Sequence, residues 1–326
     1  MSKNKVKTKT INKSEYSLGI DIGSTTVKAA ILDKDNKLIY YDYRRHFADI
    51  RDTLKGLLED AFKETGDIFV CPVITGSGGL GLANVLQVPF TQEVVAVATA
   101  LKNHEPKTDV AVELGGEDAK IIYFEDGNVE ERMNGACAGG TGAFIDQMAA
   151  LLQTDAEGLN ELAKDYESLY TIAARCGVFA KTDIQPLIND GARKEDLAAS
   201  ILQAVVNQTI SGLACGKPIR GHVAFLGGPL HFLTELKKAF IRTLKLDDEH
   251  TIDPDNSHLF AAIGSALNHE EKPLLLSELI DKLKGKIKIE IEVPRMDPLF
   301  NDENEYQEFE KRHSKAKVSK KDLSSY

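Results

Sequence analysis

The residues of this chain whose types and spacing suit chemistry are its cysteines and glycine turns. The densest stretch is NGACAGGTGAFIDQM, residues 134–148, where Cys137 precedes a Gly-Gly-Thr-Gly run that opens an apolar helical pattern. Glycines let a backbone approach a ligand closely, and a helix N-terminus attracts anions through its free N–H groups. Gly140, Thr141 and Gly142 are therefore candidate phosphate contacts. The Cys137 thiol could be a metal ligand, a nucleophile or a small buried group.

A second cysteine has the same setting. Cys176 follows Cys137 by 39 residues (176 − 137), and a helical apolar pattern begins directly after it, at Gly177. Two thiols cannot close a four-ligand cluster, but two copies of the chain related by a twofold axis could supply two thiolates each. A pair of small core cysteines is the alternative. Cys71 and Cys215 lack this setting, and we interpret both as packing residues.

A glycine turn near the N-terminus could hold phosphate. In DIGSTTVK, residues 21–28, Gly23 permits a tight turn, and the next three residues offer N–H and hydroxyl donors. Asp21 can hold Mg²⁺ through water. An ordinary polar hairpin is the alternative. The candidate donors are Ser24, Thr25 and Thr26.

This turn has a second copy further along the chain. Lys28 follows Asp21 by seven positions (28 − 21), and Lys120 follows Glu113 by seven (120 − 113). Each acid is followed two positions later by glycine, and each lysine lies in an apolar strand pattern that continues into a hairpin. Two such units indicate a duplicated α/β fold with a cleft between two lobes. The glycines of the second turn are Gly115 and Gly116.

A third glycine turn follows the apolar run HVAFL. It consists of Gly227, Gly228 and Pro229, and a helical pattern begins there. A single glycine-loop match is weak evidence for a nucleotide. Three such turns, each leaving a strand, fit one nucleotide held between two lobes.

The elements around these turns follow from apolar periodicity. A three-stranded β-meander with a turn at residues 34–37 begins the chain, and the strand at 109 starts a second hairpin, with its turn at Asp126 and Gly127. Pro186 is expected to kink or shorten the helix that begins at Gly177. Further strands are expected over 68–76, 222–226 and 286–293, and helices over 49–64, 91–104, 141–153, 194–213 and 260–269.

Composition narrows the class of protein. The net charge of −10 argues against a general nucleic-acid binder, and we find no apolar run of membrane-spanning length. The basic, polar start of the chain lacks the apolar segment of a secretory signal. A cytoplasmic, reducing location is expected, so the four cysteines should not form structural disulfides.

These elements predict two lobes around a nucleotide cleft, with lobe II carrying the candidate cluster cysteines. The expected boundaries are a disordered leader over 1–14, lobe I over 15–107 and about 258–293, lobe II over 108–257, and a charged linker or tail over 294–326.

The three glycine turns together resemble the two phosphate motifs and the adenosine motif of the acetate and sugar kinase, Hsp70 and actin superfamily, whose fold is ribonuclease H-like. The helix FAAIGSALNH looks like the small-residue helix that crosses between lobes in that superfamily. The resemblance covers roughly residues 16–269. It implies binding of ATP or ADP with Mg²⁺, but it does not specify a reaction.

NGACAGGTGAF and ARCGVFAKTD, combined with DIGSTTVKA, resemble the CoA-enzyme activase family, the activators of 2-hydroxyacyl-CoA dehydratases and the ATP-dependent benzoyl-CoA reductase subunits. The resemblance implies a homodimer that shares one 4Fe–4S cluster through Cys137 and Cys176. It also implies an anaerobic ATPase that delivers a low-potential electron to a partner metalloenzyme and receives it from a ferredoxin- or flavodoxin-like donor. The tail looks closest to a longer, multi-domain subgroup, in which a following domain could supply the other cysteines and the partner is a double-cubane-cluster protein.

Within this resemblance, Asp21 and Glu113 would orient metal and water, and Lys28 and the three turns would bind ATP. Most members have Asp-x-Gly-Gly-Gln-Asp in the second phosphate motif, whereas this chain has Glu113 and Glu117 at the first and fifth positions. The change bears on water positioning and hydrolysis, so Glu117 joins the candidate catalytic residues. Two other functions stay open: a small-molecule kinase of the same superfamily, and a nucleotide-switched binding module without a cluster.

Overall fold

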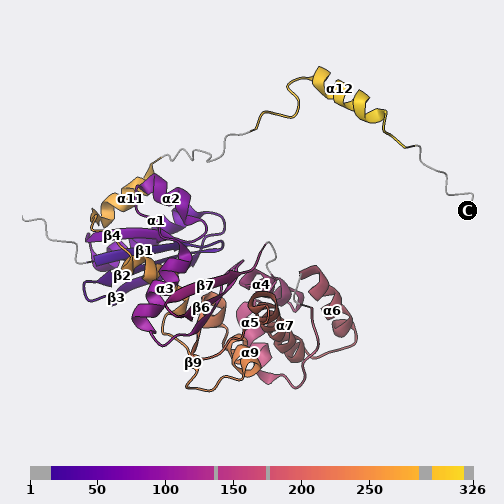
Figure 1. Ribbon diagram of the computed structural model, residues 1–326, viewed down its shortest axis with the longest axis horizontal. Coiled ribbons are helices and arrows are strands. Elements are labelled where there is room, and N and C mark those ends of the chain that lie inside the picture. The colour runs from indigo at the N-terminus through magenta and orange to yellow at the C-terminus, as the bar shows by residue number, and fades with distance from the viewer. Residues whose placement is uncertain (1–15, 136–138, 174–176, 286–295, 319–326) are drawn as a thin grey trace, which may run out of the picture. The chain divides into compact units, whose positions relative to one another are not determined.

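Two five-stranded mixed sheets carry the larger unit of the chain. The computed structural model describes residues 16–135, 139–173, 177–285 and 296–318 (Figure 1). The predicted leader over 1–14 and the strand predicted over 286–293 lie outside these ranges. The chain divides into a unit that ends at Ile287 and a second unit that begins at Lys288, and we describe each by itself.

The first sheet has the order β10-β4-β1-β2-β3. Its antiparallel meander β1–β2–β3 confirms the sequence prediction, and β4 is added parallel to β1. The turn between β2 and β3 contains Asn36, whose φ of 60° suits asparagine, and the Asp33 side chain accepts hydrogen bonds from two backbone N–H groups of the same turn. The strands are β1 (Tyr16–Ile22), β2 (Thr26–Asp33), β3 (Leu38–Arg45), β4 (Phe69–Thr75) and β10 (Leu274–Leu275).

The second sheet repeats this arrangement with the order β7-β6-β5-β8-β9. Antiparallel β5–β6–β7 corresponds to β1–β2–β3, and parallel β8 takes the place of β4. Asp126 and Gly127 both have positive φ, at 50° and 81°, as a two-residue hairpin turn requires. The predicted duplication is therefore confirmed. The strands are β5 (Val110–Leu114), β6 (Ala119–Glu125), β7 (Asn128–Met133), β8 (Val223–Leu226) and β9 (Thr251–Ile252).

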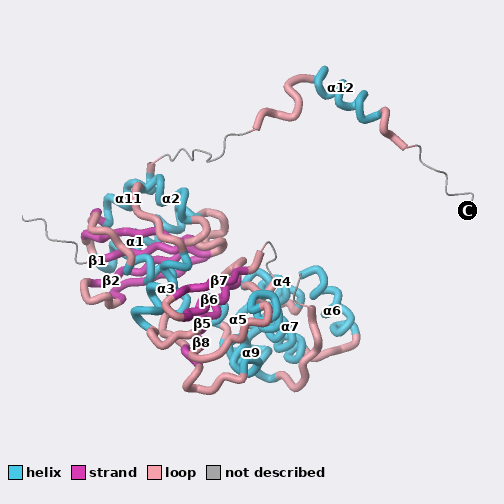
Figure 2. Tube along the Cα trace, in the orientation of Figure 1, coloured by secondary structure: helices cyan, strands magenta, loops and turns pink. Residues whose placement is uncertain are grey.

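Helices cover both sheets (Figure 2). Apolar residues of α1 (Ile50–Thr65), α2 (Gly79–Leu86) and α11 (Leu276–Lys284) form one core with the first sheet. A second core joins the other sheet to the helices of the chain's second half. Those helices are α4 (Gly142–Leu151), α5 (Ala156–Leu162), α6 (Gly177–Asn189), α7 (Lys194–Thr209), α8 (Gly228–Phe232) and α9 (Thr234–Leu244), with short helical turns Ala163–Asp165 and Ile210–Ala214.

Two helices lie between the sheets and join them. Residues of α3 (Glu93–His104) and α10 (Phe260–Leu267) share a third core with Ala30 of β2 and Ala224 of β8. Small residues allow this packing: a Cβ added at Gly264 of α10 would lie 1.7 Å from the Ala96 carbonyl oxygen of α3. The predicted small-residue helix over 260–269 is thus the contact between the lobes.

We expect Gly264→Ala to lower the free energy of unfolding by about 1–3 kcal/mol, because α10 and α3 must move apart to admit the methyl group. The matched control is Gly81→Ala in α2, where an added Cβ meets nothing within 4 Å. That control should stabilise the protein slightly, since alanine is the better helix former. Urea-induced unfolding measures both, and a Gly264→Ala variant as stable as the wild type would contradict the packing argument.

The other helix predictions were mostly correct, with ends displaced by a few residues. Helices α2 and α11 were not predicted. Pro186 does not end α6, which continues to Asn189. Cys215, which we interpreted as a packing residue, is exposed and follows a helix end in a left-handed conformation with φ 46°. Cys71 is buried, as predicted.

One helical stretch among the described residues, 194–214, is long and apolar enough to cross a membrane, which the sequence analysis did not recognise. Of its most apolar window, 67% is buried within the fold. Leu197, Ile201 and Val205 supply its contacts with the core of the second sheet. These observations fit a core helix.

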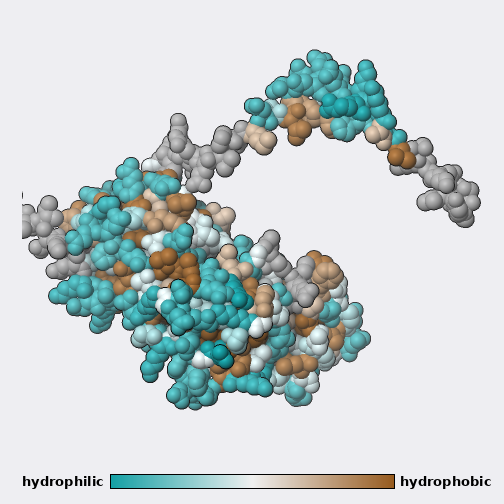
Figure 3. Space-filling view, in the orientation of Figure 1, coloured by the Kyte–Doolittle hydropathy of each residue, from teal (hydrophilic) through white to brown (hydrophobic). Residues whose placement is uncertain are grey.

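The second unit contains a helix, α12 (Glu303–Ser314), within the predicted linker or tail. Asp302 accepts a hydrogen bond from the Glu305 N–H, and the Glu305 side chain accepts one from the Asn301 N–H. Such reciprocal capping, with acidic residues in the first turn and basic ones in the last, stabilises a short helix. Hydrophobic side chains gather on one side of this segment (Figure 3).

Candidate functional site

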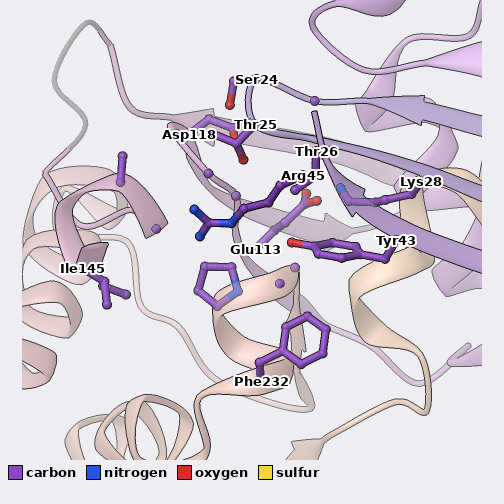
Figure 4. A pocket seen from close by; sticks show the side chains of 18 of the residues that line it. Ser24, Thr25, Thr26, Lys28, Tyr43, Arg45, Glu113, Asp118, Ile145 and Phe232 are labelled. Atoms are coloured by element: carbon purple, nitrogen blue, oxygen red, sulfur yellow. The ribbon is translucent and has the colours of Figure 1, made fainter. Parts of the chain in front are cut away.

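The three glycine turns meet at one cavity of about 160 Å³, lined from both sheets (Figure 4). The turn after β1, the turn after β5 and the turn after β8 each contribute to its wall. Glycine is needed at Gly227, where φ is 88° and a Cβ would lie 2.1 Å from the Leu114 carbonyl oxygen. The predicted site residues on the wall are Asp21, Gly23, Ser24, Thr25, Thr26, Lys28, Glu113, Gly115, Gly116, Gly142, Gly227, Gly228 and Pro229.

The seven-residue spacing of acid and lysine has a simple structural cause. Asp21 and Lys28 are cross-strand partners in the β1–β2 hairpin, and Glu113 and Lys120 are partners in β5–β6. The Lys28 Nζ lies 2.5 Å from Asp21 Oδ2. Burial alone would lower the pKa of Lys28. The ion pair with Asp21 has the larger combined effect and raises the pKa of this lysine. The ion pair with Lys28 therefore holds Asp21 in place in the cavity wall.

Two carboxylate oxygens at the cavity lack hydrogen-bond partners among the described residues. They are Asp21 Oδ1 and Glu113 Oε2, on side chains that are almost fully buried. A buried polar atom without a partner costs about 1–3 kcal/mol. Carboxylate oxygens beside hydroxyl groups are the hard oxygen donors that Mg²⁺ and its bound waters prefer. The residues present fit a magnesium ion held with a nucleotide.

Lys120 organises the acidic side of the cavity. Its Nζ lies 2.6 Å from Glu93, 2.6 Å from Asp118 and 3.8 Å from Glu113, and only 5% of its side chain is exposed. Burial opposes its charge, but the three carboxylates outweigh it and raise the pKa of Lys120 well above the usual value. Burial raises the pKa of Glu93 to about 7 and also raises that of Glu113, while Lys120 opposes both shifts.

Helix α4 begins on the second phosphate turn. Its first two N–H groups, from Gly142 and Ala143, donate to the carbonyl oxygens of Gly115 and Gly116 at 3.0 and 2.7 Å. These donors are therefore occupied by the protein. Two hydrogen bonds thus join this turn to the start of α4.

A model of the BadF/BadG/BcrA/BcrD ATPase family matches residues 18–268 of the chain. The chain belongs to this ATPase family. It is 31% identical over 223 residues to the (R)-2-hydroxyglutaryl-CoA dehydratase activating ATPase of Acidaminococcus fermentans, a match that covers 66% of this chain and 83% of that relative. It is 26% identical over 257 residues to the 2-hydroxyisocaproyl-CoA dehydratase activator of Clostridioides difficile, covering 77% and 94% of the two chains.

A solved structure supports the same assignment. The activator of the 2-hydroxyisocaproyl-CoA dehydratase from Clostridium difficile, with bound ADPNP, matches with a TM-score of 0.67 and 25% identity, over 87% of this chain and 100% of that one. The family predicted from the motifs and the duplicated two-lobe fold are thereby confirmed.

Three predicted site residues of this ATPase do not lie on the cavity wall. Thr141 is fully buried, and neither Thr141 nor Gly140 lies on the wall. The reason is that α4, which begins next to them, is hydrogen-bonded to the second glycine turn. Glu117 is exposed and borders a neighbouring cavity, and Asp118 takes the place on the wall that we expected for Glu117.

The two cluster cysteines predicted for the family, Cys137 and Cys176, lie outside the described residues. The helices that follow them are adjacent, since a Cβ added at Gly177, the first residue of α6, would lie 2.6 Å from Gln147 Oε1 of α4. Within the described ranges, no group of three or more metal-ligating side chains occurs.

Sequence reasoning missed several wall residues. Tyr43 packs edge-on against Phe232 with ring centroids 5.5 Å apart, and Arg45 forms an ion pair with Asp146 of α4 at 2.9 Å. The register of the predicted meander pairs Arg45 with Thr26, so the strand alone could have placed Arg45 beside the first turn. No local signal marks Glu93, which reaches the cavity from α3 through tertiary packing.

Proposed function

We propose that this protein is an ATP-driven electron-transfer activase, in which ATP hydrolysis drives a low-potential electron from a 4Fe–4S cluster to a partner metalloenzyme. The observation that carries the proposal is the cavity between the two sheets. Three glycine turns line it, and Asp21 and Glu113 each place there a carboxylate oxygen without a hydrogen-bond partner among the described residues. Membership of an ATPase family whose relatives are named dehydratase activators supports it.

In this proposal, the first two glycine turns hold the phosphates, and Asp21 and Glu113 orient the attacking water and the waters of Mg²⁺. The bound Mg²⁺ would neutralise charge on the phosphate oxygens. Lys28 positions Asp21 through their ion pair, and Lys120 places a positive charge 3.8 Å from Glu113. Gly227, Gly228 and Pro229 would face the adenosine. The phosphate-binding residues would be Ser24, Thr25, Thr26, Gly115 and Gly116.

Helix α4 would link the nucleotide to the electron-transfer site. Its first N–H groups are bonded to the second phosphate turn, and its chain leads back to Cys137. Because α6 packs beside α4 and begins directly after Cys176, a shift of the turn would reach both cysteine segments. Two states of the lobes would thus couple hydrolysis to the redox site.

The cluster would be held by Cys137 and Cys176 from each of two copies, or by these and cysteines of a following domain. One such cluster supplies a single electron at low potential. Its acceptor would be a 2-hydroxyacyl-CoA dehydratase, a related reductase or a double-cubane-cluster protein, and its donor a ferredoxin- or flavodoxin-like protein in the cytoplasm.

Anaerobic iron and sulfide analysis, combined with mass measurement, tests this function. We expect one 4Fe–4S cluster per dimer and a nucleotide-dependent change in its redox behaviour. Cys137→Ala and Cys176→Ala should each lose the iron, because the remaining thiolates cannot close the cluster.

The matched control is Cys215→Ala. The Cys215 thiol is exposed, and it contacts the Gly212 carbonyl oxygen at the end of its own helix. It should keep its iron. A colourless wild-type protein without iron would contradict the electron-transfer proposal, and tight ATP binding with little turnover in that protein would favour a nucleotide-switched binding module.

A further inference from the structure

Backbone pairing holds Arg45 beside the first glycine turn, residues 23–26. This arginine is the last residue of β3 and pairs with Thr26 of β2. The next residue, His46, donates its N–H to the Thr25 carbonyl oxygen at 3.1 Å, and its Nε2 lies 3.2 Å from the Gly23 carbonyl oxygen. From this fixed position, the Arg45 side chain extends into the cavity (Figure 4).

The charges on the cavity wall leave Arg45 as the cation best placed to meet a phosphate. The described wall carries two basic residues, Lys28 and Arg45. The Lys28 side chain is 15% exposed and is committed to the buried Asp21. The Arg45 side chain is 54% exposed, and its partner Asp146 is 39% exposed. The carboxylates of the wall repel a polyphosphate, so its binding requires a compensating positive charge. The exposed Arg45 side chain can reorient from Asp146 to the phosphate.

The relative strengths of the two contacts favour an exchange. An exposed ion pair such as Arg45–Asp146 shifts an equilibrium by about 1.4- to 5-fold. A charge-assisted hydrogen bond from a guanidinium group to phosphate is worth about 10- to 100-fold, because the planar fork matches two phosphate oxygens. The contact of Arg45 with phosphate is therefore stronger than its contact with Asp146.

We propose that Arg45 binds the phosphates of the nucleotide and gives up Asp146 to do so. The inference rests on the proposed function, since it requires ATP in this cavity. In the free protein, α4 packs in the core of the second sheet and makes two polar contacts at the cavity: its first N–H groups bind the second turn, and Asp146 binds Arg45 of the first sheet. Nucleotide binding removes the contact of α4 with the first sheet and leaves its contacts with the second turn and the core of the second sheet.

The dissociation constant of Mg–ADPNP, measured by titration calorimetry, tests the exchange in four proteins. Arg45→Ala should bind about 10- to 100-fold more weakly. Asp146→Asn should bind up to about five-fold more tightly, because a competitor for Arg45 has been removed. The double variant should bind like Arg45→Ala, since Asp146 acts only through Arg45. Arg45→Lys should lie between wild type and Arg45→Ala, because it keeps the charge without the fork.

Matched controls come from the neighbouring pair Arg44–Asp60, which lies 2.7 Å apart on residues outside the cavity wall. Arg44→Ala and Asp60→Asn should bind Mg–ADPNP like the wild type. If the wild type binds and Arg45→Ala binds equally well, Arg45 is no phosphate ligand. If Asp146→Asn weakens binding or leaves it unchanged, there is no exchange. A wild type that binds no nucleotide would overturn the proposed function itself.

Discussion

Lys120→Met is expected to lower the free energy of unfolding by about 3–5 kcal/mol, the usual cost of breaking a buried ion pair from one side. The side chains have similar size, so packing changes little. The substitution leaves Glu93, Glu113 and Asp118 around an apolar side chain with no cation between them. Urea-induced unfolding at neutral pH measures the loss.

The destabilisation should depend on pH. Burial already raises the pKa values of Glu93 and Glu113 in the folded protein, and Lys120 holds them down. Without Lys120, both folded pKa values rise further above those of the unfolded chain. A group with a raised folded pKa contributes stability at low pH and loses it as pH rises, so Lys120→Met should lose more stability at about pH 8 than at about pH 5.5.

Lys217→Met is the matched control. Lys217 also contacts two carboxylates, Glu125 at 3.0 Å and Glu130 at 2.7 Å, but both of these partners are exposed. Exposed ion pairs contribute about 0–1 kcal/mol. Equal losses in the two variants, or a loss at Lys120 that does not change with pH, would show that burial of the Lys120 cluster has no energetic consequence.

The duplicated fold could be predicted because the sequence repeats its own chemistry. Acid and lysine seven positions apart are partners across a tight hairpin, as Asp21–Lys28 and Glu113–Lys120 show. Local periodicity then gave the meanders and most of the helices. Helix α2 was missed because three of its eight positions hold Gly or Asn, which are poor helix formers.

The part of the site that could not be predicted depends on contacts between distant segments. Glu93 and Lys120 are 27 positions apart, and Arg45 and Asp146 are 101 positions apart. Neither pair has a spacing that a single helix or hairpin explains. The placement of Thr141 off the cavity wall has a similar origin, because the start of α4 directly after it is hydrogen-bonded to the backbone of Gly115 and Gly116.

Asp21→Asn is expected to lower the rate of ATP hydrolysis by about 10²–10³-fold, the effect of removing one preorganised electrostatic group. Its Oδ1 atom is buried and has no hydrogen-bond partner among the described residues, so it is available to a metal-bound or attacking water. An amide keeps the shape but loses the charge. Steady-state phosphate release, with Mg–ADPNP binding measured separately, distinguishes turnover from affinity.

The loss should fall on kcat, with the affinity for Mg–ADPNP changed by less than about ten-fold, because the two glycine turns still hold the phosphates. Glu113→Gln should show a similar loss, and the double variant should lose less than the product of the two, since both carboxylates act on the same water and metal. The control is Glu125→Gln, which changes an exposed carboxylate that is paired with Lys217 and lies on the same sheet as Glu113. This variant should hydrolyse ATP at the wild-type rate. An Asp21→Asn variant with wild-type turnover would remove Asp21 from the reaction and leave its unpartnered oxygen without a role.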